Sequence, residues 1–211
     1  MSATLGYEDL VRMLYGAVQE IRNNHEVLSK LDSVGGDGDH GSTMFRAMTR
    51  LEDAVKACVT PTLKALLYDV GWAILGVDGG ATGPLLGTLF MSMSEATGDR
   101  ETLDNLALAF AFEEGYKGVT RQTKAQPGDK TMIDALTPAV KALRTAADEG
   151  ADVTEMMRRA AAAAQTGAES TAAMQARFGR AKNIKEQSIG HQDPGATSMA
   201  FLFLGFSKGI E

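Results

Sequence analysis

The segment Leu31-Asp-Ser-Val-Gly-Gly-Asp-Gly-Asp-His-Gly-Ser42 places three aspartates, Asp32, Asp37 and Asp39, within eight residues. Carboxylates this close repel one another, so folding them together raises their pKa values unless a positive charge arrives. Mg²⁺ and Ca²⁺ are the cations that prefer such oxygen ligands, and the intervening glycines permit the sharp turns that converging side chains require. A solvated acidic turn is the alternative interpretation, because Asp and Gly are ordinary turn residues.

Helical periodicity flanks this segment on both sides. Leu10, Leu14, Ala17 and Ile21 recur at spacings of three and four residues, which places them on one helix face. No stretch shows the strict alternation of a half-buried strand, so we predict an all-α bundle of about eight helices. Comparable faces occur at 44–55, 63–75, 84–95, 103–119, 132–147, 153–174 and 194–206.

The composition agrees with one globular domain. The chain has 211 residues, of which 44% are hydrophobic and 23% charged, so it can bury a core. The net charge of −6, without a Lys/Arg cluster, argues against nucleic-acid binding. The single cysteine, Cys58, favours a reducing compartment. Neither a signal peptide nor a membrane-spanning stretch is visible, so we expect a cytoplasmic protein that does not bind a membrane.

Two predicted helix starts have sequences suited to binding an anion. Thr82 is expected to cap a helix with Pro84 in its first turn, and Asp193 to cap the last helix with Pro194 following. Helix N-termini expose N–H groups and partial positive charge, so these starts, together with the acidic segment, indicate a phosphorylated ligand. Capping alone explains each start, but the run Gly79-Gly-Ala-Thr-Gly-Pro84 holds more glycine than a cap requires.

Familiar nucleotide and calcium motifs do not explain the acidic segment. Residues 36–41 formally fit GxGxxG, but no strand precedes them and two aspartates would repel a bare pyrophosphate. An EF-hand beginning at Asp37 would have Gly41 at position five and Met48, instead of Glu, at position twelve. The P-loop and the GxSxG elbow are also absent.

Five segments of the chain, in order, resemble the nucleotide-binding L subunit of dihydroxyacetone kinases. They lie at 32–41, 79–85, 127–132, 179–181 and 188–198. The resemblance covers nearly the full chain and implies a single nucleotide-binding L-type domain over residues 1–211. It also implies an antiparallel barrel of eight helices that holds an adenine nucleotide at one end.

The resemblance assigns site residues as well. It implies that Asp32, Asp37 and Asp39 hold two Mg²⁺ ions on the phosphates of ADP or ATP, and it assigns no catalytic residue. The implied nucleotide contacts are His40, Gly41, Ser42, Thr43, Ala81, Thr82, Met132, Arg180, Asp193, Pro194 and Gly195. The chain departs from the family at Ser42-Thr43, at 121–124 and at 182–187, all around the expected nucleotide rim.

The implied function is that of one subunit of a two-component kinase for dihydroxyacetone or a related short ketose. A separate K-type subunit would hold the ketose, and a homodimer of the present chain is left open. Two versions remain: ATP is consumed as a substrate, or bound ADP is rephosphorylated by an M-type phosphotransferase subunit. An interpretation of a different class is a non-enzymatic helical module whose acidic segment holds a structural cation.

Overall fold

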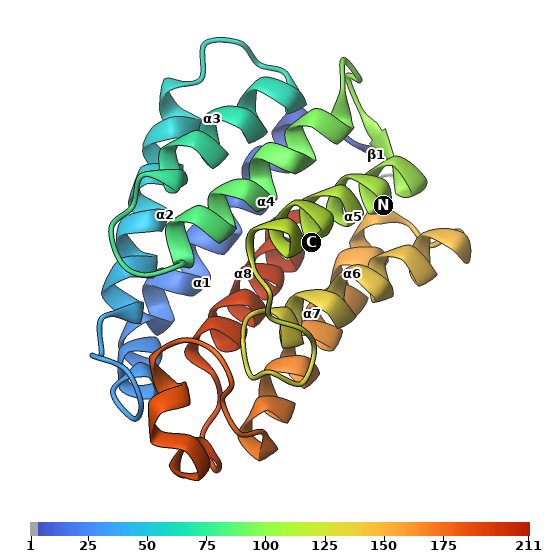
Figure 1. The fold of residues 1–211 in the computed structure, drawn as a ribbon. Helices are drawn as coiled ribbons and strands as arrows, with labels where there is room; N and C mark the ends of the chain where they lie inside the picture. The colour runs from blue at the N-terminus through green and yellow to red at the C-terminus, as the bar shows by residue number, and fades with distance from the viewer. Residues whose placement is uncertain (1–3) are drawn as a thin grey trace.

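The computed structural model describes residues 4–211, which form a barrel of α-helices (Figure 1). A short antiparallel pair of strands, β1 (Thr4–Leu5) and β2 (Leu103–Asp104), ties the N-terminal segment to the start of α5. The prediction of an all-α fold with about eight helices is confirmed. The helices are α1 (Tyr7–Asp32), α2 (His40–Ala57), α3 (Leu63–Leu75), α4 (Thr82–Thr97), α5 (Asn105–Gln122), α6 (Ile133–Asp148), α7 (Val153–Ser170) and α8 (Pro194–Ile210), with the 3-10 segments η1 (Thr171–Ala173) and η2 (Arg180–Ser188) before α8.

The order of packing follows the order of the chain. Each helix packs against the next one, and α8 packs against both α7 and α1, which closes the ring. Most connections are short, so consecutive helices run antiparallel (Figure 1). As a consequence, the N-termini of α2, α4, α6 and α8 lie at the end of the barrel where α1, α3, α5 and α7 finish.

The contact between α1 and α8 is a direct contact between backbones. A Cβ atom on Gly16 would overlap the carbonyl oxygen of Gly205, and one on Gly205 would overlap Ala17. A Cβ on Gly209 would overlap the carbonyl oxygen of Arg12, one turn further along. Three glycines on the facing sides of α1 and α8 therefore allow the first and last helices to meet without intervening side chains.

Aromatic side chains fill the barrel at the end away from Asp32. Phe112 and Phe203 are fully buried with ring centroids 5.6 Å apart, and Phe206 lies 5.8 Å from Phe203. Phe90 of α4 completes the cluster by an edge contact with Phe206 at 6.4 Å. Such pairs contribute about 0.5–1.5 kcal/mol each beyond the area they bury. This end of the barrel is thus a packed core, and the open end lies opposite.

Two sequence-based expectations about helix ends were wrong. Thr82 does not cap α4, because Ala81 is the N-cap and Thr82 is the first helical residue. The helix expected over 153–174 ends at Ser170, where the hydroxyls of Ser170 and Thr171 donate to the carbonyls of Gly167 and Ala168. Side-chain bonds of this kind compete with continued helix.

The expected cap at Asp193 is confirmed, since its carboxylate accepts the N–H of Ala196 at 2.7 Å.

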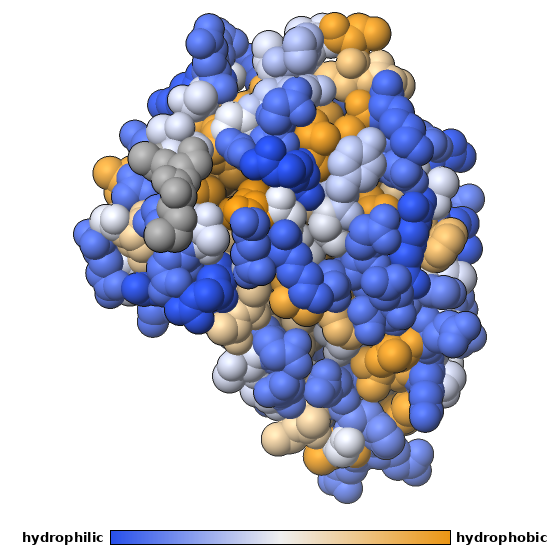
Figure 2. All heavy atoms as spheres, turned by 180° about the vertical axis from the view of Figure 1, so that it is seen from behind, coloured by the Kyte–Doolittle hydropathy of each residue, from blue (hydrophilic) through white to orange (hydrophobic). Residues whose placement is uncertain are grey.

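Across residues 4–211, no helix combines the length and apolar character needed to cross a bilayer. The rear face of the molecule is largely hydrophilic, with hydrophobic side chains in patches between hydrophilic ones (Figure 2). That distribution is ordinary for a surface in contact with water.

We expect Gly205→Ala to lower the free energy of unfolding by about 1–3 kcal/mol, because overpacked contacts force backbone shifts. Urea denaturation followed by circular dichroism measures the change. Gly76→Ala is the control, since a Cβ there meets nothing within 4 Å and its φ is −85°. Equal midpoints for wild type and Gly205→Ala would show that the two helices are not in backbone contact.

Candidate functional site

The four N-termini at the open end of the barrel surround a cavity of about 300 Å³. His40 begins α2, Thr82 begins α4, Ile133 begins α6 and Gly195 lies in the first turn of α8, and all four residues line the cavity. Each helix start presents N–H groups and about half a positive charge. The open end of the barrel is therefore suited to an anionic ligand.

The deeper part of the cavity is apolar. Five side chains from α2, α4, α8 and the start of α6 form this floor: Met44, Leu86, Met132, Met199 and Leu202. Flexible methionines adapt to flat aromatic groups, and small-molecule sites commonly combine an apolar floor with a few polar groups. A ligand with one flat apolar part and one anionic part matches this arrangement.

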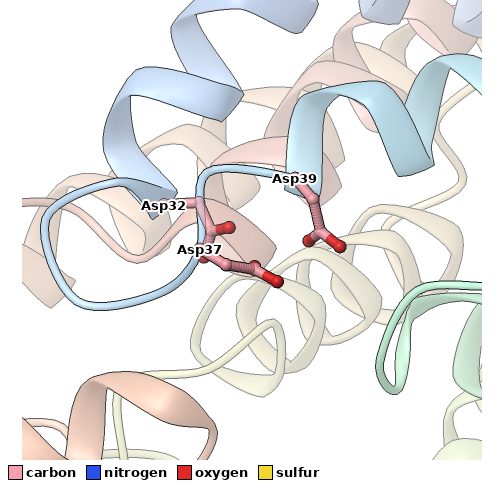
Figure 3. Close-up of side chains that lie close together, drawn as sticks. All are labelled: Asp32, Asp37 and Asp39. Atoms are coloured by element: carbon pink, nitrogen blue, oxygen red, sulfur yellow. The ribbon is translucent and has the colours of Figure 1, made fainter.

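The three aspartates of the acidic segment, here called the acid cluster (Asp32, Asp37 and Asp39), converge beside this cavity. Asp32 ends α1, Asp39 is the N-cap of α2, and Asp37 lies in the loop between them. One carboxylate oxygen from each lies within 4.8 Å of the others, and the three side chains gather along one side of the loop (Figure 3). This donor set fits Mg²⁺, which prefers carboxylate oxygens.

Two glycines make the convergence of the acid cluster sterically feasible. Gly38 has φ +77°, a conformation that side chains with a Cβ rarely adopt. A Cβ on Gly36 would overlap the carboxylate of Asp32. The loop between α1 and α2 therefore needs glycine at both positions if the three carboxylates are to meet.

Arg180, at the start of η2, faces the acid cluster. Its guanidinium forms an ion pair with Asp37 and lies 3.8 Å from the carboxylate of Asp39. Both partners are about half exposed, so the pair contributes little to stability. Its consequence is positional, because it places a permanent cation at the mouth of the cavity.

His40 links the starts of three helices. Its Nε2 lies 3.0 Å from the Ser198 hydroxyl of α8, and its Nδ1 lies 3.5 Å from the Thr82 hydroxyl of α4. The Ser198 hydroxyl donates to the carbonyl of Gly195 at 3.0 Å, so it accepts from Nε2–H and leaves Nδ1 to accept from Thr82. Burial lowers the pKa of His40, partly offset by Asp32, and a neutral ring satisfies both bonds.

Asp193 stands at the cavity wall as the N-cap of α8. Burial raises its pKa to about 7, while the N–H of Ala196 and the ammonium of Lys130 act in the opposite direction. Its own N–H donates to the hydroxyl of Thr171 at 2.8 Å. The start of α8 is therefore held in two ways. The carboxyl group of Asp193 accepts a bond from within α8, and its backbone N–H bonds to Thr171 just after α7.

The structure does not bring every predicted residue to the cavity. The side chain of Thr43 is buried against Gly79 and accepts a hydrogen bond from Arg46 at 3.0 Å. Gly41 packs against the backbone of α1, and the hydroxyl of Ser42 donates to the carbonyl of Asp39. The predicted residues that do line the cavity are Asp32, Asp39, His40, Ala81, Thr82, Met132, Arg180, Asp193 and Gly195, while Pro194 lines a smaller adjoining one.

Sequence reasoning missed Lys130, which is 4% exposed and lines both cavities. It also missed Phe178, which lines both as well, as a wall residue. The segment Gly128-Asp-Lys-Thr131 reads as an exposed turn, and no local pattern distinguishes a buried lysine from a solvated one. Residues 127–132 are one of the segments that carry the family resemblance, which implied a contact for Met132 and none for Lys130.

The fold and site define an α-helical barrel with an anion-binding end and a cluster of metal-type carboxylates. The family model described as the DAK2 domain matches residues 34–208, and this chain belongs to that family. It is 41% identical over 177 residues to the ADP-binding subunit DhaL of the PEP-dependent dihydroxyacetone kinase of Escherichia coli (strain K12), a match that covers 84% of each chain. The predicted resemblance to the L subunit of dihydroxyacetone kinases is confirmed.

Other comparisons agree. The ADP-binding subunit DhaL of the PEP-dependent dihydroxyacetone kinase 1 of Listeria innocua is 37% identical over 193 residues, covering 92% of this chain and 91% of that protein. The crystal structure of the dihydroxyacetone kinase from C. freundii in complex with AMP-PNP and Mg²⁺ superposes with a TM-score of 0.72 at 26% identity. That match covers 93% of this chain and 33% of the longer C. freundii chain.

We expect the raised pKa of Asp193 to give stability a pH dependence. The folded protein keeps this proton up to about pH 7, whereas the unfolded carboxyl loses it near its ordinary value of 3.8. Within this window the folded state binds more protons, so the contribution of Asp193 to the free energy of unfolding falls as the pH rises. Above pH 7 the contribution levels off at its lowest value.

Asp193→Asn isolates this contribution, because an amide oxygen still caps the helix but does not titrate. Urea unfolding of both proteins, without metal or nucleotide, should show wild type losing stability relative to the variant between about pH 4.5 and pH 7. Parallel pH profiles would contradict the raised pKa.

Proposed function

We propose that this chain is the nucleotide-binding subunit of a two-component kinase for dihydroxyacetone or a closely related short ketose. Family membership and the names of its relatives, which are ADP-binding subunits of similar length, support the proposal. The observation that carries it is the placement of three carboxylates beside four helix N-termini, at the mouth of an apolar cavity. One domain over residues 1–211, working in the cytoplasm, is part of this proposal.

Different residues of the site are suited to different parts of an adenine nucleotide. The apolar floor, with Met132, takes the base, and the helix starts at His40, Thr82 and Gly195 face the phosphates. The acid cluster would hold two Mg²⁺ ions, which would supply the positive charge that offsets the phosphates during transfer. Arg180 adds a fixed positive charge beside them.

The acceptor ketose would come from a partner. A nucleotide occupies the cavity in this proposal, so a K-type subunit presents the ketose across the mouth, where the phosphates end. The Escherichia coli and Listeria innocua relatives are named PEP-dependent. Those names favour the version in which bound ADP stays in place and an M-type subunit rephosphorylates it, over the version in which ATP is consumed.

Thermal melting with Mg²⁺ alone, ADP alone and both together tests the proposed function. We expect the combination to stabilise the protein most, by about 2.7 kcal/mol at a hundredfold excess over Kd. A helical module with a merely structural cation would gain from Mg²⁺ and gain nothing further from ADP. Retention of labelled ADP through desalting would support the rephosphorylated-cofactor version, whereas free exchange would support a direct kinase.

We expect Asp37→Asn to lose most of the Mg²⁺-dependent stabilisation by ADP, because one of three metal-facing carboxylates becomes neutral. Without ligands, its stability should stay within about 1 kcal/mol of wild type, since less carboxylate repulsion offsets the lost pair with Arg180. Asp53→Asn is the control, an exposed carboxylate on the outer face of α2. Undiminished Mg²⁺ dependence in Asp37→Asn would refute the metal assignment, and gross unfolding would make the loop a structural element.

A further inference from the structure

The 171–193 segment, here called the C-terminal loop, forms one wall of the cavity. It leaves the barrel at the end of α7, passes through Phe178 and Arg180 at the cavity, and returns at Asp193 to begin α8. Its two ends come together where the N–H of Gly190 donates to the carbonyl of Ala172 at 2.8 Å. The position of every wall residue in the loop therefore depends on how its base is held.

The base of this loop is held by the side chain of Lys130. Its Nζ donates to the carbonyl oxygens of Ser188 and His191 at 2.6 Å each, and to that of Thr171 at 2.8 Å. A fourth carbonyl, that of Met174, lies at 3.2 Å. Two of these acceptors belong to the outgoing part of the loop and two to the returning part. One ammonium group thus joins both ends of the loop to the turn before Met132.

The backbone at Lys130 is itself held in an unusual conformation. Its φ is +61°, in the left-handed region that costs residues with a side chain on the order of 1 kcal/mol. Buried Asp134 fixes the turn by accepting the N–H groups of Gly128 at 2.5 Å and Thr131 at 2.8 Å. The surrounding bonds therefore impose the strained conformation that directs the lysine beneath the loop.

Burial of this ammonium is costly, and the pKa of Lys130 is lowered because burial disfavours its charged form, while Asp193 acts in the opposite direction. An apolar side chain at this position would avoid that cost but remove a donor from all four carbonyl oxygens, of which that of Thr171 keeps a second donor, the N–H of Met174. The four bonds converge on one point, as they would on a bound monovalent cation. An ammonium at the end of a long stem has three N–H donors, which match the three short contacts, and the longer contact to Met174 shares one of them.

We propose that Lys130 is a positioning residue that holds the C-terminal loop against the barrel, so that Phe178, Arg180 and Asp193 keep their places around the ligand. Lys130 affects the ligand through the loop and not by direct contact, because its N–H groups donate to carbonyl oxygens of the loop. This inference rests on the proposed function only for its nucleotide readout, since the order of the loop is measurable without any ligand.

Lys130→Met tests the proposal, because it keeps the length of the stem and removes the ammonium. We expect amide hydrogen exchange over 174–191 to accelerate about tenfold in the ligand-free protein, as the buried carbonyls lose their donor. Exchange in α3, on the other side of the barrel, should stay as in wild type. We also expect ADP to dissociate about tenfold faster in the presence of Mg²⁺.

Two controls separate positioning from general stability. Lys141→Met makes the same substitution at an exposed lysine in the middle of α6, away from the cavity, and should change neither readout. Leu108→Ala leaves a cavity in the packed core at the far end of the barrel, so it lowers overall stability without touching the loop. It should leave the dissociation of ADP unchanged.

The proposal would be overturned if residues 174–191 of Lys130→Met exchanged their amide hydrogens at the wild-type rate. It would also be overturned if Leu108→Ala accelerated ADP release as much as Lys130→Met does. If wild type itself fails to bind ADP with Mg²⁺, the proposed function fails, and hydrogen exchange alone decides the role of Lys130. If Lys130→Met does not fold, Lys130→Arg takes its place. A planar guanidinium cannot direct donors to four converging carbonyls, so faster loop exchange is still expected, and wild-type exchange would overturn the proposal.

Discussion

The direct backbone contact between α1 and α8 is the constraint on which the rest of this structure depends. It closes eight alternating helices into a ring, and closure with an even number of helices makes the first and last antiparallel. The C-terminus of α1, which carries Asp32, therefore lies beside the N-terminus of α8, which carries Asp193. Gly16 and Gly205 make the contact sterically feasible because neither has a Cβ. Residues at opposite ends of the chain thereby share one cavity.

The alternating direction of consecutive helices also determines the electrostatics of the open end of the barrel. Four helix N-termini bring partial positive charge to a site where three carboxylates also gather. Arg180 balances part of the negative charge, and the neutral ring of His40 joins three of the helices through hydroxyl groups. Polyanions and divalent cations bind well together in such surroundings, because each compensates the charge that the other meets. A chain with a net charge of −6 can hold a polyphosphate in this way.

The site has two parts that differ in how they are held. The helix starts and the apolar floor belong to the packed barrel, whose far end is filled by aromatic rings. The C-terminal loop, by contrast, is irregular backbone that depends on particular hydrogen bonds, with Lys130 at its base. Local opening costs least where few apolar groups are buried, so the loop is the part of the site most open to adjustment.

Much of the fold and part of the site could be predicted from local patterns. Helical periodicity gave the eight helices, and the expected range of α3, 63–75, matches the observed helix. The acid cluster could be recognised because its three aspartates lie within eight residues and glycines separate them. The cap at Asp193 was likewise a local matter, since a carboxylate bonds to an N–H three residues further on.

The remaining features depend on contacts between distant segments. Thr82 faces His40 instead of capping its own helix, and Thr43 is buried against Gly79 instead of facing the cavity. Lys130 is buried because carbonyl groups 41 to 61 positions away surround its ammonium. The sequence by itself determined which segments are helical and where the carboxylates cluster, because those properties arise between near neighbours. Only the tertiary structure decided which side chains face the cavity, because that depends on how the closed ring orients each helix.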